Sequence, residues 1–208
     1  KQSLALISDA GLPGISDPGE KLVFAAKSQG NNVICIPGPC AATTALVSSG
    51  LPSDRFCFEG FLPLKGKARK ELLAKIANEA RTTVIYEAPH RLVKLLQELN
   101  ELCGEGRPLQ VARELTKFHE QQIGPTIGRA LEYFLVKKPI GECTIILGGA
   151  PAKSNVQLNR SELLAEMRVL VESGTSANEA AKTLAIKTGQ PKRVLYALLH
   201  EIDINNYN

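Results

Sequence analysis

LALISDAGLPGISDPG, residues 4–19, decides the fold, because an apolar run typical of a short buried strand leads directly into a turn rich in glycine and proline. The same pattern returns in VICIPGPCAA, residues 33–42. Between them, Asp17-Pro18-Gly19-Glu20 offers an N-cap, a proline for the first helical position and a capping acid, so we expect a helix that ends at Gly30. A second helix is expected to follow the second turn. Strand, helix, strand, helix is the order typical of a parallel sheet in an α/β fold.

Both turns follow the carboxyl ends of their strands, which is where ligands of open α/β sheets bind. Small residues at such places let a ligand approach the backbone closely. Neither turn has the lysine of a Walker A loop, and Gly11-Leu12-Pro13-Gly14 lacks the spacing of a dinucleotide-binding loop. The two turns therefore favour one wall of a cleft for a nucleoside, held by backbone amides and by a carboxylate such as Asp9.

A second α/β unit is expected after Leu51-Pro52-Ser53-Asp54, which is typical of a linker. Its expected strands are Phe56–Phe61, Thr82–Glu87, Leu109–Leu115 and Glu142–Leu147. Its expected helices are Lys67–Asn78, one from Pro89 to Gly104, and one that Thr126 caps. We divide the chain into residues 1–52, the C-terminal half of a first α/β domain; 53–150, a second α/β domain; and 160–204, a three-helix tail with helix-turn-helix-like spacing.

The bulk composition is that of a water-soluble globular protein. The 208 residues are 44% hydrophobic and 22% charged, which is ordinary for this class. The net charge of +4 permits a nucleic-acid partner without requiring one. No apolar stretch reaches the ~20 residues of a membrane span, and the five cysteines form no Cys-x-x-Cys pair. We therefore expect a cytoplasmic protein with no membrane partner and no metal.

Charged side chains gather where strands of the second unit end. Glu87 and Arg91 flank one strand end, and Arg113, Glu114 and Lys117 follow another. Such a cluster is typical of a reactive site, although capping and ion-pair roles at the rim of a sheet stay open. The stretch 65–81 is also strongly basic, which predicts RNA contact or, alternatively, a solvated helix face. Its candidates for RNA contact are Lys65, Lys67, Arg69 and Lys70.

Five strings together resemble the ribosomal RNA small subunit methyltransferase I family of the tetrapyrrole methylase superfamily. They are residues 8–19, residues 37–42, FEGFLP at 58–63, YEAPHR at 86–91 and VARELTK at 111–117. The resemblance covers nearly the whole chain and implies two α/β domains with S-adenosylmethionine in the cleft between them. It also implies 2′-O-methylation of a cytidine in 16S rRNA, S-adenosylhomocysteine as product, the small ribosomal subunit as partner, and a homodimer.

The resemblance also assigns roles to residues of this chain. It implies that the cofactor is bound by Asp9, Ala10, Gly11, Ile15, Cys40, Ala41, Tyr86 and Ala112. The ribose hydroxyl needs a group that takes or hydrogen-bonds its proton, and the catalytic candidates are Glu87, Arg113 and Glu114. Structural roles stay open for the two glutamates. The candidate phosphate anchors are Arg91, Arg113 and Lys117.

Two departures from the family pattern change what we expect. Cys40 stands where the family has a serine, so a hydroxyl contact is replaced by a thiol. The family's first strand and its Gly-Thr-Pro-Ile-Gly-Asn loop lie upstream of the position of Lys1. We therefore expect a truncated first domain and weak cofactor binding by this chain alone. A tetrapyrrole C-methylase and an inactive RNA-binding fragment are the alternatives.

Overall fold

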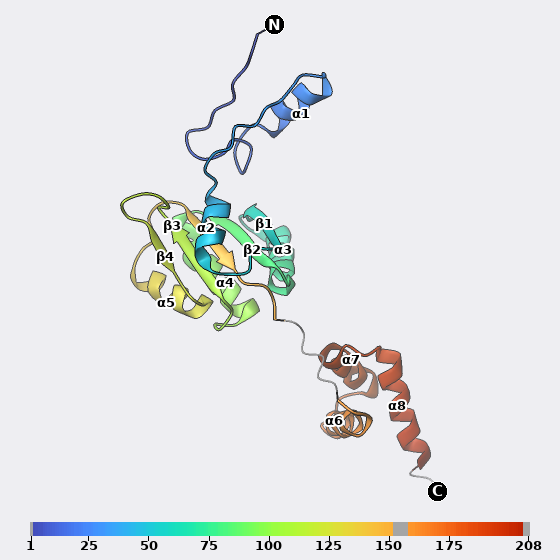
Figure 1. The fold of residues 1–208 in the computed structure, drawn as a ribbon. Helices are drawn as coiled ribbons and strands as arrows, with labels where there is room; N and C mark the ends of the chain where they lie inside the picture. Colours follow the sequence, from blue (N-terminus) through green and yellow to red (C-terminus); the bar gives the residue numbers. More distant parts are fainter. Residues whose placement is uncertain (1, 152–157, 206–208) are drawn as a thin grey trace. The chain divides into compact units, whose positions relative to one another are not determined.

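A five-stranded sheet is the centre of the first of two units, Lys1–Ala150 and Pro151–Asn208, into which the chain divides (Figure 1). The computed structural model describes residues 2–151 and 158–205. The strands are β1 (Phe56–Phe61), β2 (Thr82–Glu87), β3 (Leu109–Arg113), β4 (Gln121–Ile123) and β5 (Cys143–Leu147). Their order across the sheet is β1-β2-β5-β3-β4, with β1 and β2 parallel and every other neighbouring pair antiparallel. The α/β class is confirmed, and the sheet is mixed.

Helices cover both faces of this sheet. On one face lie α3 (Gly66–Asn78), α4 (Pro89–Cys103) and α5 (Ile127–Val136). On the other lies α2 (Ala41–Ser49). Alternate strand residues point to opposite faces, so Ile85 and Ile145 join the core under α4, whereas Val84 and Ile146 pack against α2. The helices expected from Pro89 to Gly104 and after Thr126 are confirmed, with Thr126 accepting a hydrogen bond from the Arg129 amide.

Strand β1 has a bulge that changes which way its aromatic side chains point. Phe58 pairs with Val84 and Phe61 pairs with Tyr86, so three positions along β1 correspond to two along β2. The register shifts at Gly60, which has a φ of 60°. An extra residue in one strand turns the following side chains to the opposite face. Both phenylalanines therefore lie on the face that α2 covers.

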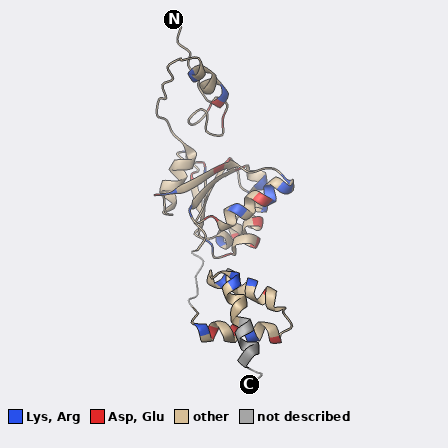
Figure 2. Cartoon of the chain, turned by 90° about the vertical axis from the view of Figure 1, so that its right-hand side faces the viewer, with Lys and Arg blue, Asp and Glu red and all other residues tan. Residues whose placement is uncertain are grey.

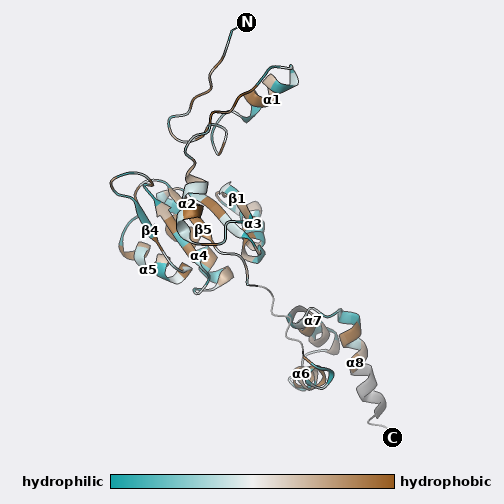
Figure 3. Ribbon diagram, viewed as in Figure 1, coloured by the Kyte–Doolittle hydropathy of each residue, from teal (hydrophilic) through white to brown (hydrophobic). Residues whose placement is uncertain are grey.

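The two strands expected near the N-terminus are wrong. Leu4–Ile7 and Val33–Ile36 belong to no strand, and Ile7, Ile34 and Ile36 are each more than 70% exposed. A strand is stable only when neighbouring chains satisfy its backbone groups, and no described strand lies beside these segments. The helix between them, α1 (Glu20–Ser28), begins after Gly19 and not at Asp17. Apolar side chains of α1 stay exposed (brown in Figure 3).

The end of β3 also differs from the expectation. The strand stops at Arg113 because Glu114 and Thr116 have φ values of 51° and 65°, outside the extended region. The chain turns and returns as β4, a strand of three residues that the sequence pattern did not reveal. The expected strand Leu109–Leu115 therefore ends two residues early, and Glu114 has no place on a sheet face.

The second unit consists of three helices, α6 (Arg160–Glu172), α7 (Ala177–Thr188) and α8 (Lys192–Asn205). Ser176 is the N-cap of α7, and its hydroxyl accepts the amide hydrogen of Glu179. The reciprocal capping box lies at α6, between Asn159 and Glu162. The apolar centre of the unit is formed by Leu163, Met167, Ala180, Ala181, Leu184 and Leu195. In the part of the chain that the structure describes, no helix combines the length and apolarity needed to cross a membrane.

Candidate active site at one edge of the sheet

Two rows of paired residues cross the sheet at one edge. Tyr86, Thr144, Ala112 and Gln122 are register partners along the first row. Glu87, Cys143, Arg113 and Gln121 are partners along the second, one residue away. Paired residues share a face and consecutive residues do not. The cofactor candidates Tyr86 and Ala112 thus lie on the α2 face, and the catalytic candidates Glu87 and Arg113 lie on the face that α3, α4 and α5 cover.

The N-terminus of α2 is held against the first row by a tyrosine. The backbone amide of Ala42 donates to the Tyr86 hydroxyl over 3.0 Å. Cys40 is the N-cap of this helix, and its own side chain accepts no capping hydrogen bond. A helix N-terminus has free amides and a partial positive charge. The expected cofactor residues Cys40, Ala41 and Tyr86 are therefore brought together at a place suited to a polar ligand.

The environment keeps the Tyr86 hydroxyl protonated. Burial, and after it the neighbouring Cys40 thiol, raise its pKa from 10.0 to about 12. The rings of Phe58 and Phe61 lie 5.1 and 5.6 Å from the Tyr86 ring, measured between centroids. Both phenylalanines are partly exposed. An apolar surface able to receive a flat ring thus adjoins the α2 amides.

The two glycine- and proline-rich turns lie beside each other, as the cleft hypothesis requires. A Cβ at Gly11 would come within 3.6 Å of the Pro39 carbonyl oxygen. The first turn also approaches β1, because a Cβ at Gly60 would lie 3.0 Å from Ser16 Oγ. Such close approaches between backbone segments leave little room for larger side chains. Asp9, Ala10 and Ile15 of the first turn are exposed.

Glu87 is enclosed by arginines and has no access to solvent. Its carboxylate lies 2.5 Å from an Arg91 nitrogen and 4.0 Å from Arg69 Nη1, and its side chain is 0% exposed. Arg69 also pairs with Glu98 and donates to the Pro63 carbonyl oxygen. A buried carboxylate between two guanidinium groups is typical of an ion-pair network inside the core. The catalytic role expected of Glu87 is therefore not supported, and its contacts are those of a residue that stabilises the fold.

The second charged group, around the end of β3, is more accessible. Arg113 donates to Gln121 over 2.8 Å and to the Ile140 carbonyl oxygen over 2.9 Å. Glu114 lies 3.1 Å from Lys117 Nζ, and its side chain is 22% exposed. Between the charged groups, burial raises the pKa of the Cys143 thiol to about 11, Arg113 opposes the shift and Glu87 adds to it. Glu114 and Lys117 keep the exposure that contact with a large substrate needs.

The basic stretch divides into exposed and buried members. Lys65, Lys67 and Lys70 are exposed at the N-terminal end of α3 (blue in Figure 2). Arg69 is only 4% exposed and bonded to Glu98. The RNA contact expected of Arg69 is not supported, because its guanidinium group is already occupied inside the protein. The three lysines and the partly exposed Arg91 and Lys117 remain candidates.

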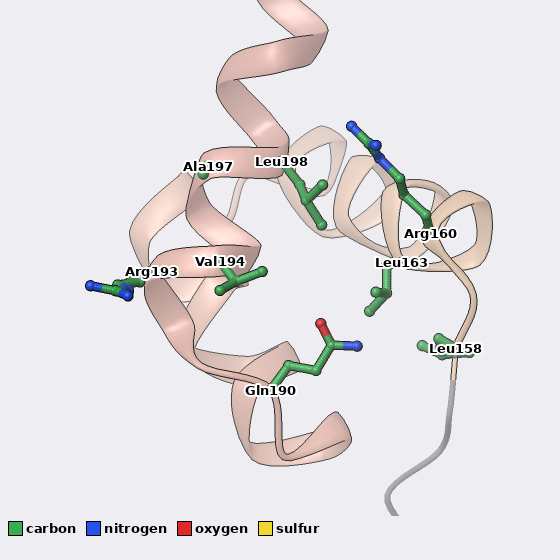
Figure 4. A pocket seen from close by; sticks show the side chains of 8 residues that line it. All are labelled: Leu158, Arg160, Leu163, Gln190, Arg193, Val194, Ala197 and Leu198. Carbon is green, nitrogen blue, oxygen red and sulfur yellow. The ribbon is translucent and has the colours of Figure 1, made fainter.

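An open hollow of about 680 Å³ lies in the helical unit (Figure 4). Leu163 from α6 and Val194 and Leu198 from α8 face it, whereas Arg193 points away from it. Gln190 extends into the same hollow. None of the residues expected to bind the cofactor lines it. Within residues 2–151 and 158–205, no group of three or more His, Cys, Asp or Glu side chains is placed to hold a metal ion.

Sequence reasoning missed three residues that the structure adds to this site. Phe58 and Phe61 reach Tyr86 only because of the bulge, and Ser16 reaches β1 only because position 60 is a glycine. The Phe-Glu-Gly-Phe string contained the signal, since a glycine inside a strand often marks a bulge or a close approach. Which face of the sheet each phenylalanine lies on could not be predicted without the register of β1 against β2.

Comparison with known proteins places this geometry in a family. The family model of the tetrapyrrole (corrin/porphyrin) methylases matches residues 1–131. The ribosomal RNA small subunit methyltransferase I of Synechocystis sp. is 45% identical over 202 residues, which are 97% of this chain and 72% of that protein. The protein of the same name from Haemophilus influenzae is 42% identical over 196 residues, 93% of this chain and 69% of that protein.

Solved structures share the fold at low identity. The methyltransferase CobJ matches with a TM-score of 0.52 and 20% identity over 67% of this chain and 62% of its own. The cobalt-precorrin-4 methyltransferase CbiF matches with a TM-score of 0.50 and 16% identity, over 66% of this chain and 61% of its own. The chain thus spans less than two thirds of the length of these structures. It belongs to the tetrapyrrole (corrin/porphyrin) methylases and, among them, to the ribosomal RNA small subunit methyltransferase I family.

Proposed function

We propose that this protein takes part in the transfer of a methyl group from S-adenosylmethionine to the 2′-hydroxyl of a cytidine in 16S rRNA. The observation that carries the proposal is 45% identity, over 97% of the chain, to a protein named ribosomal RNA small subunit methyltransferase I. The site adds chemical support, since it offers free amides and aromatic surface on one side of the sheet edge and exposed charged groups on the other.

The residues near the α2 N-terminus fit an adenosyl group. The close approaches at Gly11 and Gly60 shape a backbone wall, and Phe58 and Phe61 supply surface for a purine ring. Cys40 and Ala41 place their backbone at the helix N-terminus, which accepts polar and anionic groups. In this proposal Asp9, Ala10 and Ile15 complete the wall, and Ala112 leaves room beside Tyr86 because its side chain is small.

When bound, S-adenosylmethionine supplies an activated sulfonium methyl group, which bonds to the ribose oxygen while sulfur keeps the electron pair and S-adenosylhomocysteine results. The chain's own residues must orient the hydroxyl and receive its proton. Tyr86 stays protonated with a pKa of about 12 and is therefore no base at neutral pH. Glu114 is the partly exposed carboxylate among the catalytic candidates, so we assign it the role of accepting the hydroxyl proton. We assign Arg113 and Lys117 the role of binding the adjacent phosphates.

The partners and the domain arrangement belong to the same proposal. Residues 1–52 are assigned to a first α/β domain and 53–150 to a second, with the cofactor between them and residues 160–204 as a helical tail. The substrate is the small ribosomal subunit or its RNA, which the protein meets in the cytoplasm as a homodimer. Exposed Lys65, Lys67 and Lys70 offer charge for phosphate contact.

The direct test is methyl transfer by the full-length protein from tritiated S-adenosylmethionine to small ribosomal subunits. We expect label in 16S rRNA at a position that resists alkaline cleavage, because a methylated 2′-oxygen cannot attack the phosphate. Glu114→Gln should lower kcat by roughly 10²-fold or more, whereas Glu132→Gln, at an exposed ion pair on α5, should leave it unchanged. Label that enters a tetrapyrrole, or no acceptor at all, would exclude the proposed reaction.

A further inference from the structure

Phe118 exposes its ring almost completely. It lies in the loop between β3 and β4, and 96% of its surface is accessible. Exposing an aromatic ring to water is unfavourable, and no described core residue packs on it. Neither the cofactor wall nor the catalytic carboxylate needs a ring at this position.

The loop that carries Phe118 is held in one shape. The Lys117 amide donates to the Glu114 carbonyl oxygen over 3.0 Å, and the Glu120 amide donates to that of Lys117 over 3.1 Å. The Thr116 amide donates to the Glu120 carboxylate over 2.7 Å. Glu114 and Thr116 have positive φ values, which are strained for residues other than glycine, above all for a β-branched threonine. These hydrogen bonds therefore hold the backbone from which the Phe118 ring projects.

Lys117 and His119 flank the ring in the chain. The His119 ring meets Phe118 edge-on with centroids 5.0 Å apart, at an interplanar angle of 80°. Lys117 precedes it, and Arg113 at the base of the loop bonds to the Ile140 carbonyl oxygen. An exposed aromatic ring beside cationic side chains is the combination with which proteins bind single-stranded nucleic acid, because bases stack on the ring and phosphates meet the charges.

We propose that Phe118 stacks on an unpaired base of the RNA substrate and so positions the target ribose near Glu114. This inference rests on the proposed function and adds to it a residue that recognises the substrate. A base that stacks on Phe118 would bring its backbone to Arg113 and Lys117, which adjoin the same loop.

A tryptophan reporter tests the stacking directly. The 208 residues contain no tryptophan, so Phe118→Trp introduces a fluorophore at the proposed contact. We expect oligocytidylate to quench its emission, and the same strand paired with oligoguanylate to quench it far less. Leu102→Trp is the control. Leu102 is 50% exposed near the end of α4, before β3 begins, whereas Phe118 lies in the loop after β3 ends. Equal quenching of both reporters, or none at position 118, would overturn the proposal.

Kinetics separate this inference from the proposed function. Phe118→Ala should raise KM for small subunits roughly 5- to 100-fold, from the usual worth of one stacked base, with kcat and S-adenosylmethionine binding little changed. Phe118→Tyr should restore KM. If wild-type protein methylates the subunit and Phe118→Ala does so equally well, the stacking role is wrong while the function stands. If KM rises without quenching by oligocytidylate, the ring contacts a ribosomal protein, and the RNA proposal fails.

Discussion

At the scale of single residues, one hydroxyl group connects the sheet to the helix that begins the candidate cofactor site. The Tyr86 hydroxyl accepts a hydrogen bond from the Ala42 amide, whereas the N-cap residue Cys40 makes no capping hydrogen bond with its side chain. Removing the hydroxyl leaves a partly buried amide without its partner, which costs roughly 1–3 kcal/mol. The hydroxyl is also a titratable group whose environment favours the protonated form.

Alkaline titration should reveal this environment. The folded-state pKa of Tyr86 is about 12 against an ordinary value of 10.0, so the unfolded chain loses this proton first as pH rises. The stability contribution is therefore complete below pH ~10 and is lost towards pH ~12. Urea unfolding across this range should show a shallower fall of stability for Tyr86→Phe than for wild type.

The Cys143 thiol, with a pKa of about 11, also lowers the stability as pH rises. Because it is present in every protein compared, it does not change the difference between them. Parallel stability curves for wild type and Tyr86→Phe would contradict the assigned environment.

At the scale of elements, the bulge in β1 decides which aromatic rings reach the site. Without it, Phe58 and Phe61 would lie on opposite faces of the sheet. Gly60 has a left-handed backbone and lies within reach of Ser16 Oγ. The same glycine thus allows both the turn of the strand and the approach of the first loop.

Gly60→Ala should lower the free energy of unfolding by roughly 2 kcal/mol, from the left-handed backbone and the crowding of Ser16 together. Gly66→Ala is the control, because Gly66 has a φ of 86° but nothing within 4 Å of an added Cβ. It should cost roughly 1 kcal/mol. Adding Ser16→Ala to Gly60→Ala should recover part of the difference in urea unfolding. Equal losses for the two alanine variants would show that the first loop does not press on β1.

The sequence predicted elements well where the signals are local. Pro89 and Gly104 bound α4, and Thr126 caps α5, because caps depend on the adjacent backbone. The strands expected at Leu4–Ile7 and Val33–Ile36 failed because a strand depends on partners elsewhere in the chain. The short strand β4 offers only three residues of pattern, too few to distinguish from a loop.

The site could be predicted in part for the same reason. Cys40, Ala41 and Tyr86 lie close together at the start of α2, and their role in cofactor binding stays a prediction. Glu87, at the end of β2, is enclosed by Arg91 and by Arg69, which comes from α3 and was itself expected on the surface. Such a pairing depends on how α3 packs, and nothing in the local pattern of either residue shows it.

At the scale of the whole molecule, positive charge is concentrated on one exposed helix end. Lys65, Lys67 and Lys70 lie at the start of α3, and among them Lys67 has an ion-pair partner, Glu71, at 3.7 Å. Exposed pairs of this kind are weak, so the lysines stay available to phosphates.

Reversing the three lysines to glutamate should weaken binding to small-subunit RNA and lower its salt dependence. Each lost phosphate contact reduces the slope of log Kobs against log salt by about one. Filter binding at several salt concentrations measures this slope. Lys27→Glu on α1 is the control for a general change of charge, and a slope unchanged by the triple reversal would remove α3 from the RNA interface.

The extended segments Leu4–Ile7 and Val33–Ile36 have a consequence for how the protein behaves in concentrated solution. In each segment, backbone peptide groups without strand partners lie beside exposed apolar side chains. Unpaired backbone of this kind is a template on which other polypeptides assemble. Solubility at high concentration, during expression as well as storage, therefore depends on whatever shields these two lengths of backbone.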